Sequence, residues 1–303
     1  MERTGKSRVF KNKSALFFYI CIVALPTLQF LIFYVGVNFN SIILAFKKYD
    51  GDVARFAGFD NFVLAFKNLA NSPEVNPAIK NSLILYACTV FITFGALVFA
   101  FYIYKRHVGS ELFRFVLFLP QIISSVVLVL IFMYFVEEGL PALGITEVGL
   151  IANPKTDFQT ILFYNIWAGF GTQLMMYNGA MRAIPESVGE AAKIDGASSF
   201  QEFIFITIPS IWGTLSTFIV VCICEIFTNM MSLVSFKALG AESRLITFGY
   251  YLYREMWRAS KGGVVIGGKL PYLSAMGVIF SAIAISATLL VRRLLKKLGP
   301  KTE

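Results

Sequence analysis

Polar residues at regular spacing interrupt an apolar segment in the second half of the chain. Cys222, Glu225, Asn229 and Ser232 are three, four and three residues apart, the spacing of side chains that share one face of an α-helix. Thiol, carboxylate, amide and hydroxyl groups at this spacing can exchange hydrogen bonds with a polar solute. A carboxylate facing lipid is costly, so this stripe is expected to face the protein interior or a wet cavity.

A preceding apolar segment carries polar side chains of the same kind, namely Asn165, Trp167, Gln173 and Asn178. We take five residues as candidates for a solute pathway: Cys222, Glu225, Asn229, Asn165 and Gln173. The alternative is that they hydrogen-bond neighbouring helices, as Ser, Thr, Asn and Gln commonly do inside membranes. Glu225 could also pair with a cation of a partner subunit. The sequence leaves these interpretations open.

Residue types suited to catalysis or metal binding are scarce. His107 is the only histidine, and all four cysteines lie in apolar runs, so neither a metal centre nor a disulfide framework is expected. The stretch "GVVIGGKL", ending at Leu270, resembles a nucleotide-binding loop. However, Leu270 stands where a hydroxyl must ligate magnesium. We therefore expect a chain with no catalytic residues, no metal and no cofactor of its own.

The composition indicates a membrane protein. Hydrophobic residues make up 57% of the 303 residues and charged residues 15%, against about 25% charged in soluble proteins. Each of six apolar runs is long enough, as a helix, to cross about 30 Å of hydrocarbon. The predicted spans are 15–37, 78–104, 112–136, 158–181, 211–234 and 270–291. The runs do not alternate as barrel strands do, so an all-α fold is predicted, with 15–292 as the transmembrane domain.

Basic residues gather at both ends of the chain. Five precede the first predicted span and five follow the sixth: Arg3, Lys6, Arg8, Lys11, Lys13, Arg292, Arg293, Lys296, Lys297 and Lys301. Such clusters favour the cytoplasmic side, so residues 1–14 and 293–303 are both predicted to be cytoplasmic, which requires an even number of spans. The net charge of +9 then indicates contact with anionic lipid and not with nucleic acid.

The polar stretch "IPESVGEAAKIDGASSF" separates the fourth and fifth predicted spans. Pro185 suits the first turn of a helix, and Gly196 ends that helix because glycine enters the left-handed region freely. Ser199 and Glu202 have the S-x-x-E spacing of a capping box, which predicts a second helix. With the N-terminus inside, the loop 182–209 is predicted to be a cytoplasmic helix-turn-helix.

One face of the first loop helix is expected to be thin. Ala191 and Ala192 would let the backbone of another protein approach closely, and Glu190, Lys193 and Asp195 offer polar contacts around them. The alternative is a solvated helix that only ties two spans together.

The same stretch resembles the EAA loop of binding-protein-dependent ABC importer permeases. That loop reads E-A-A, three residues, G, nine residues, I, one residue, L-P. The matching residues are Glu190, Ala191, Ala192, Gly196, Ile206 and Pro209, and Ile208 stands in place of the leucine. The segments "FRFVLFLPQIISSVVL", "AFKKYDG" and "FAGFDNF" also resemble carbohydrate permeases. The chain is most similar to the six-span, first-subunit type that includes glycerol-3-phosphate and lactose permeases.

The resemblance implies a non-catalytic subunit of an ATP-driven importer in a prokaryotic plasma membrane. Two separate ATPase subunits would bind ATP and Mg and receive the loop through its coupling residues: Glu190, Ala191, Ala192, Asp195 and Gly196. A second, non-identical permease and an extracellular solute-binding protein would complete the assembly. The solute would be a carbohydrate, in particular an oligosaccharide, which the Asn, Gln and Trp side chains suit.

Two other functions are compatible with a multi-span protein. A stand-alone channel or ion-coupled secondary transporter would favour paired carboxylates within spans or inverted repeats. The chain has one such carboxylate, Glu225, and no visible repeat. An intramembrane enzyme would need a nucleophile–base set, but neither H-E-x-x-H nor G-x-S-x-G occurs. Both functions are therefore disfavoured.

Overall fold

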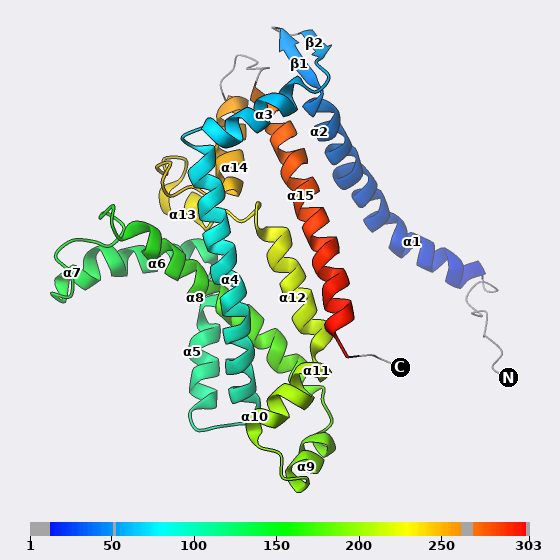
Figure 1. Cartoon of the computed structure of the whole chain (residues 1–303), viewed down its shortest axis with the longest axis vertical. Coiled ribbons are helices and arrows are strands. Elements are labelled where there is room, and N and C mark those ends of the chain that lie inside the picture. The colour runs from blue at the N-terminus through cyan, green and yellow to red at the C-terminus, as the bar shows by residue number, and fades with distance from the viewer. Residues whose placement is uncertain (1–12, 51–52, 262–268, 301–303) are drawn as a thin grey trace. The chain divides into compact units, whose positions relative to one another are not determined.

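The computed structural model describes residues 13–50, 53–261 and 269–300. Most of the basic N-terminal segment and residues 263–268 of the nucleotide-loop-like stretch lie outside this part of the chain. The structure divides into two compact units, Met1–Phe66 with Ala259–Ile279, and Lys67–Arg258 with Phe280–Glu303. Helices dominate both units (Figure 1), which confirms the predicted all-α class.

The first unit begins with a run of apolar helix and continues into a small hairpin. The helical run consists of α1 (Lys13–Gln29), the π-helix η2 (Phe30–Gly36) and α2 (Val37–Ala45). Strands β1 (Lys47–Asp50) and β2 (Val53–Phe56) pair antiparallel, and α3 (Asp60–Asn71) follows. The Asn61 amide donates to both Ala45 O and Lys47 O at 2.8 Å, which holds the start of α3 against the end of α2.

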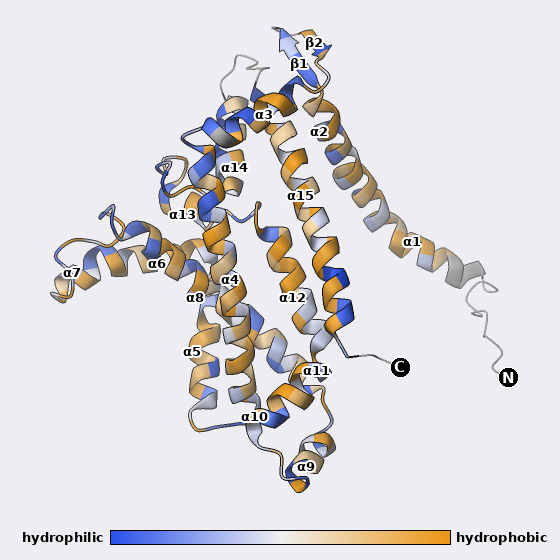
Figure 2. Cartoon of the chain, in the orientation of Figure 1, coloured by the Kyte–Doolittle hydropathy of each residue, from blue (hydrophilic) through white to orange (hydrophobic). Residues whose placement is uncertain are grey.

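The core of the second unit lies between three helices, α4 (Val75–Tyr104), α8 (Asp157–Arg182) and α12 (Trp212–Glu225). Small residues on α4 let helices α8 and α12 approach closely, and large apolar side chains fill the remaining space. The buried cluster consists of Ala96, Leu97, Ala100, Tyr177, Met181, Ile211 and Leu215. Figure 2 shows that the α4 and α12 ribbons are largely apolar.

The predicted third span is not one continuous helix. The structure has α5 (Ser110–Ile122), then α6 (Ser125–Tyr134), the π-helix η3 (Phe135–Gly139) and the short α7 (Leu140–Ala142). Between α5 and α6 the backbone is extended, with ψ of 140° at Ile123 and 132° at Ser124. Pro120 lies in the last turn of α5 and lacks the N–H that would continue the hydrogen-bond ladder.

The predicted fifth span also differs from the observed helices. Short elements α9 (Glu186–Ile194), α10 (Ser199–Glu202), η4 (Phe203–Thr207) and α11 (Ile208–Ser210) lead to α12, with a bend of 74°. Helix α12 stops at Glu225, well before the predicted end at residue 234. Turns then lead to α13 (Leu233–Lys237), α14 (Phe248–Lys261) and α15 (Lys269–Leu298).

Four helical stretches in the described part of the chain are long and apolar enough to cross a membrane. They are Phe17–Ala45, Val75–Tyr104, Ser125–Ala142 and Lys269–Leu298. The bent pair Ser199–Ser210 and Trp212–Glu225 makes a fifth if it is one span. Helix α8, the predicted fourth span, is not among them, because polar side chains recur along it. The count of six spans therefore stays a prediction.

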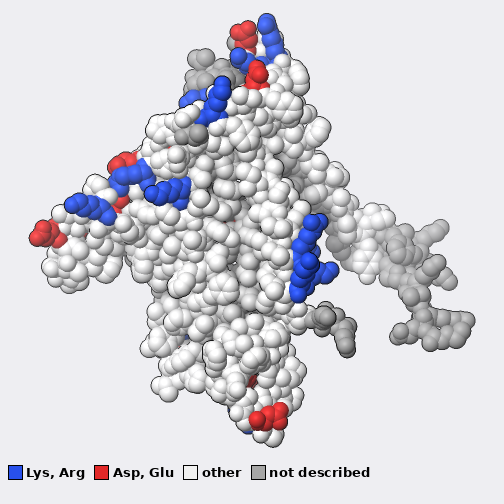
Figure 3. Space-filling view, in the orientation of Figure 1, with Lys and Arg blue, Asp and Glu red and all other residues white. Residues whose placement is uncertain are grey.

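The loop segment with α9–α11 lies at the basic end of the second unit. The Trp212 indole N–H donates to Leu295 O at 3.2 Å, so the start of α12 meets the end of α15. The last turns of α15 carry Arg292, Arg293, Lys296 and Lys297, all exposed, and they form a continuous cationic strip in Figure 3. The segment directly before Trp212 therefore lies at the same end of this unit as the cations.

Candidate functional site

A cavity of about 280 Å³ lies between α4, α8 and α12 and extends to the turn after α12. All five candidate pathway residues line it, although they come from positions far apart in the sequence: Asn165, Gln173, Cys222, Glu225 and Asn229. Each helix contributes one face at helical spacing. Leu85, Thr89 and Ile92 come from α4, and Phe218 lies one turn before Cys222 on α12.

Two polar groups in this cavity are available to a ligand. The Gln173 Oε1 atom is buried and has no hydrogen-bond partner. The Glu225 side chain is exposed, and its carboxylate forms no hydrogen bond or ion pair with the described residues. A buried acceptor without a partner is costly, so Gln173 would gain from a hydroxyl or a water molecule that donates to it.

Cys222 and Asn165 line the same cavity, but their polar atoms already have partners. The Cys222 thiol is 4% exposed and lies 3.6 Å from Thr93 Oγ1, which links α12 to α4. The Asn165 Nδ2 atom donates to Ile161 O at 2.8 Å and to Met231 O at 3.0 Å, and its Oδ1 accepts from Ser232 Oγ at 2.8 Å. The Asn165 amide therefore supports the cavity wall.

The turn after α12 closes one side of this cavity. The Asn229 N–H donates to Glu225 O at 2.9 Å, so nearly helical spacing continues to Asn229. Met231 and Ser232 then adopt left-handed conformations, with φ of 52° and 51°, which are strained for residues other than glycine. The prediction that Ser232 shares a helical face with Cys222 is therefore wrong, because the helix has ended before it.

Long-range hydrogen bonds explain why the helix does not continue. Besides the Asn165 bonds, Thr247 Oγ1 donates to Asn229 O at 2.8 Å. A local bond from the Met231 N–H to Asn229 Oδ1, at 2.9 Å, closes the turn. The apolar run alone predicts a helix to residue 234, and the contacts from α8 and from the segment before α14 hold the chain in a turn instead.

Two further polar residues of α8 do not line the cavity. The Trp167 ring packs against Phe132 and Tyr164, at centroid distances of 6.5 and 6.3 Å. Asn178 is 6% exposed and its amide donates to Ala100 O at 3.4 Å, inside the contact between α4 and α8. For Asn178 the structure supports the alternative interpretation, interhelical hydrogen bonding.

The loop 182–209 forms the helix-turn-helix that its sequence predicts. Pro185 precedes α9 with φ of −58° and ψ of 136°, and Gly196 follows it with φ of 75°. Among the proposed coupling residues, Glu190, Ala191, Asp195 and Gly196 are exposed, whereas Ala192 is only 6% exposed. Ala191 therefore presents the small outward face, and Ala192 packs inward.

The capping box at the second helix is shifted by one residue from the prediction. The Gln201 N–H donates to Ser198 Oγ at 3.3 Å, and the Ser198 N–H donates to Gln201 Oε1 at 2.8 Å. The predicted partner Glu202 is 5% exposed and pairs with Lys105. The Gln201 amide can take the place of the Glu202 carboxylate in the capping box. The partly buried Lys105 ammonium needs a charged partner, which Glu202 provides.

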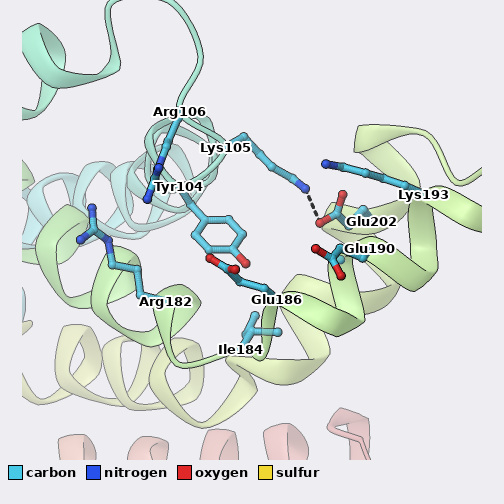
Figure 4. A pocket seen from close by; sticks show the side chains of 10 residues that line it. Tyr104, Lys105, Arg106, Arg182, Ile184, Glu186, Glu190, Lys193 and Glu202 are labelled. Atoms are coloured by element: carbon cyan, nitrogen blue, oxygen red, sulfur yellow. Dashed lines mark hydrogen bonds and ion pairs between the residues drawn. The ribbon is translucent and has the colours of Figure 1, made fainter.

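A second cavity, of about 310 Å³, lies beside α9 (Figure 4). Its wall comes from the ends of α4 and α8 and from α9 and α10, and consists of Tyr104, Lys105, Arg106, Arg182, Ile184, Glu186, Gly189, Glu190, Lys193 and Glu202. Charges of both signs suit contact with charged side chains of another protein better than capture of one small ion. The sequence does not predict a role for Lys105. The one signal is that Lys105 lies in the short basic segment after the second predicted span.

An ion-pair cluster holds the opposite end of α8. Arg244 donates to both carboxylate oxygens of Asp157, at 2.6 and 2.5 Å, and Asp157 is 2% exposed. Hydrogen bonds to Asp157 and then to Glu242 raise the pKa of the Arg244 guanidinium above its ordinary value. In the described residues, no group of three or more His, Cys, Asp or Glu side chains is placed to hold a metal ion.

Residues 91–300 match the family described as "Binding-protein-dependent transport system inner membrane component". The chain is 26% identical over 302 residues to the "Probable ABC transporter permease protein YurN" of Bacillus subtilis, which covers 94% of this chain and 98% of that protein. It is 24% identical over 304 residues to the diacetylchitobiose uptake system permease protein NgcF of Streptomyces coelicolor, covering 90% and 81%.

A solved structure has the same fold. A crystal structure of a bacterial alginate ABC transporter in complex with alginate pentasaccharide-bound periplasmic protein contains a chain that matches this one with a TM-score of 0.74. The two are 21% identical, and the match covers 98% of this chain and 99% of that chain. The chain therefore belongs to the family of inner membrane components of binding-protein-dependent transport systems, a family of multi-pass permease subunits.

Proposed function

We propose that this chain is a permease subunit of an ATP-driven importer that passes a neutral oligosaccharide into the cytoplasm. The observation that carries the proposal is the cavity between α4, α8 and α12, which brings five polar residues from separate segments to one place inside a membrane protein. Family membership supports transport, and a relative named for uptake of diacetylchitobiose supports a carbohydrate.

The chemistry of the cavity favours a neutral sugar over an acidic one. Gln173 Oε1 and the Glu225 carboxylate are acceptors for sugar hydroxyls, and the Phe218 ring offers an apolar face. The cavity wall has one carboxylate and no Lys or Arg. An anionic uronate would therefore meet Glu225 without a compensating cation.

The distribution of charge supports an orientation with both termini in the cytoplasm. The exposed cations at the end of α15 favour the cytoplasmic side. The Trp212–Leu295 hydrogen bond places the helix-turn-helix loop at that same end of the second unit. The loop would then be accessible to a cytoplasmic ATPase.

The proposed assembly contains several other chains. Two ATPase subunits would bind ATP and Mg and contact the exposed surface of α9, including Glu190, Ala191 and Asp195. A second, non-identical permease subunit would complete the pathway, and an extracellular binding protein would deliver the sugar. This chain would contribute no catalytic group and bind no cofactor.

The proposal is tested by purifying the chain from its native membranes with the proteins that accompany it. The complex is reconstituted in liposomes with the binding protein, and uptake of a radiolabelled neutral trisaccharide and of a uronate trisaccharide is measured. We expect ATP-dependent uptake of the neutral sugar and little of the uronate. Uptake driven by an ion gradient without ATP would instead indicate a secondary transporter, and uptake of the uronate alone would overturn the assignment of a neutral solute.

Variants of Glu225 test whether the cavity is the route. We expect Glu225→Gln, which keeps an acceptor, to retain most uptake, and Glu225→Ala to reduce it by about ten- to a hundredfold, since one lost hydrogen bond to a charged group is worth about 1.5–3 kcal/mol. Thr217→Val is the matched control, because Thr217 is an exposed polar residue of α12 outside the cavity wall. Equal uptake by all three variants would exclude Glu225 from the pathway.

A further inference from the structure

The end of α4 is tied to the helix-turn-helix loop by a buried ion pair. The Lys105 ammonium pairs with Glu202 Oε1, across 97 residues of sequence. The side chains are 17% and 7% exposed, respectively. The pair is less exposed than a surface ion pair, although both residues also line the second cavity, so salt screens it less than it screens an exposed pair.

Neighbouring contacts make the same connection rigid. The Lys105 ammonium lies 5.7 Å from the centroid of the Phe101 ring, and Phe101 packs against Phe203 of η4 at a centroid distance of 4.8 Å. Gly189 of α9 lies over the carboxylate, since a Cβ atom there would be 3.5 Å from Glu202 Oε1. The carboxylate therefore lies between the end of α4 and α9, and Figure 4 shows Glu202 between Lys105 and Lys193.

The covalent connection from the loop to the spans is less direct. From α10 the chain passes through the π-helix η4 and the short α11, and then bends by 74° at Ile211 before α12 begins. A displacement of α9 and α10 can be absorbed at such a bend. The Lys105–Glu202 pair bypasses it, because Lys105 directly follows the last residue of α4.

We propose that the Lys105–Glu202 ion pair is the contact that transmits movement of α9 and α10 to α4, and that both residues are positioning residues for transport. Helix α4 carries Leu85, Thr89 and Ile92 of the cavity wall, and its Ala96 and Ala100 pack in the core with α8. A shift of α4 would change the shape of the cavity. This inference rests on the proposed function.

The test uses the complete complex with Lys105→Met, Glu202→Gln and the charge swap Lys105→Glu with Glu202→Lys. We expect each single variant to retain the co-purifying ATPase and its hydrolysis, but to transport at least tenfold less neutral trisaccharide per ATP hydrolysed. The swap should recover a substantial part of this ratio. The control is Glu111→Gln at the start of α5. This variant removes the ion pair between Glu111 and Arg114 and should leave the ratio unchanged.

A wild-type ratio in the single variants would overturn the proposal, and so would loss of the ATPase from the single variants, since the pair would then serve assembly. A second measurement on the purified full chain does not depend on the transport assay. Thermal midpoints of the two single variants and the swap should show a coupling, with the swap closer to wild type than either single variant. A swap no more stable than the single variants would refute the link itself, whereas a wild-type complex without ATP-driven uptake would refute only the proposed function.

Discussion

The helix-turn-helix loop and the cavity differ in the range of the contacts that shape them. In the loop, the Ser198–Gln201 capping box spans three residues, and the Ala197 N–H donates to Ala192 O at 2.9 Å. Around the cavity, the decisive bonds join residues 67 apart in Asn165–Ser232 and 129 apart in Cys222–Thr93. The turns of the loop are therefore shaped mainly by local sequence, with the Lys105–Glu202 pair as the long-range exception, and the cavity by the packing of distant segments.

This difference predicts two kinds of mutational effect. A change at a loop turn that leaves the Lys105–Glu202 pair intact should alter that turn and the transport that depends on it, while the rest of the fold remains stable. A change in the cavity wall should lower the stability of several helices together, because the Asn165–Ser232, Cys222–Thr93 and Thr247–Asn229 hydrogen bonds join different segments. The two regions can therefore be compared by measuring stability and uptake in the same variants.

The largest effect on stability is expected for Asn165→Leu. The substitution leaves Met231 O and Ser232 Oγ without their hydrogen-bond partner, which costs about 1–3 kcal/mol for each buried group. It also releases Met231 and Ser232 from their strained left-handed conformations. The thermal midpoint of the purified chain should fall clearly. Asn165→Asp keeps the acceptor for Ser232 and should give an intermediate value. A wild-type midpoint for Asn165→Leu would mean that the turn is not held from α8.

A smaller and local effect is expected for Gly196→Val. A β-branched residue at φ of 75° costs about 1–2 kcal/mol, so the turn between α9 and α10 should rearrange. ATP-dependent uptake should fall several-fold while the thermal midpoint changes little. The control is Gly179→Val in α8, where a Cβ atom meets nothing within 4 Å and φ is not positive. If Gly196→Val lowers the midpoint as much as Asn165→Leu, the distinction between the two regions fails.

The smallest effect is expected for Ser198→Ala. Loss of a capping side chain costs about 1 kcal/mol, and it should appear as faster hydrogen exchange at the Gln201 amide, with little change in uptake. Ser199→Ala should leave that exchange rate as it is in the wild type. The reverse result would place the capping box at Ser199, as its S-x-x-E spacing predicts.

Several features of the molecule could be predicted because short-range physics determines them. Pro185 and Gly196 fix the ends of α9 through their own backbone preferences. Apolar runs near 78–104 and 270–291 become the long helices α4 and α15, because apolar length determines them directly. The capping box is predicted at Ser199–Glu202 but lies at Ser198–Gln201, which has the same spacing one residue earlier. The buried Lys105 ammonium, distant in sequence, decides between them.

The sequence by itself determined that Asn165, Gln173, Cys222, Glu225 and Asn229 are polar residues in apolar segments, and residue type and helical spacing suffice for that. Only the tertiary structure decided that these residues line one cavity, that α12 ends at Glu225, and that the Asn165 amide holds the turn while Gln173 Oε1 remains available. The physical reason is that each of these outcomes depends on hydrogen bonds between segments many residues apart. Such bonds can override local helix preference, and no local pattern encodes them.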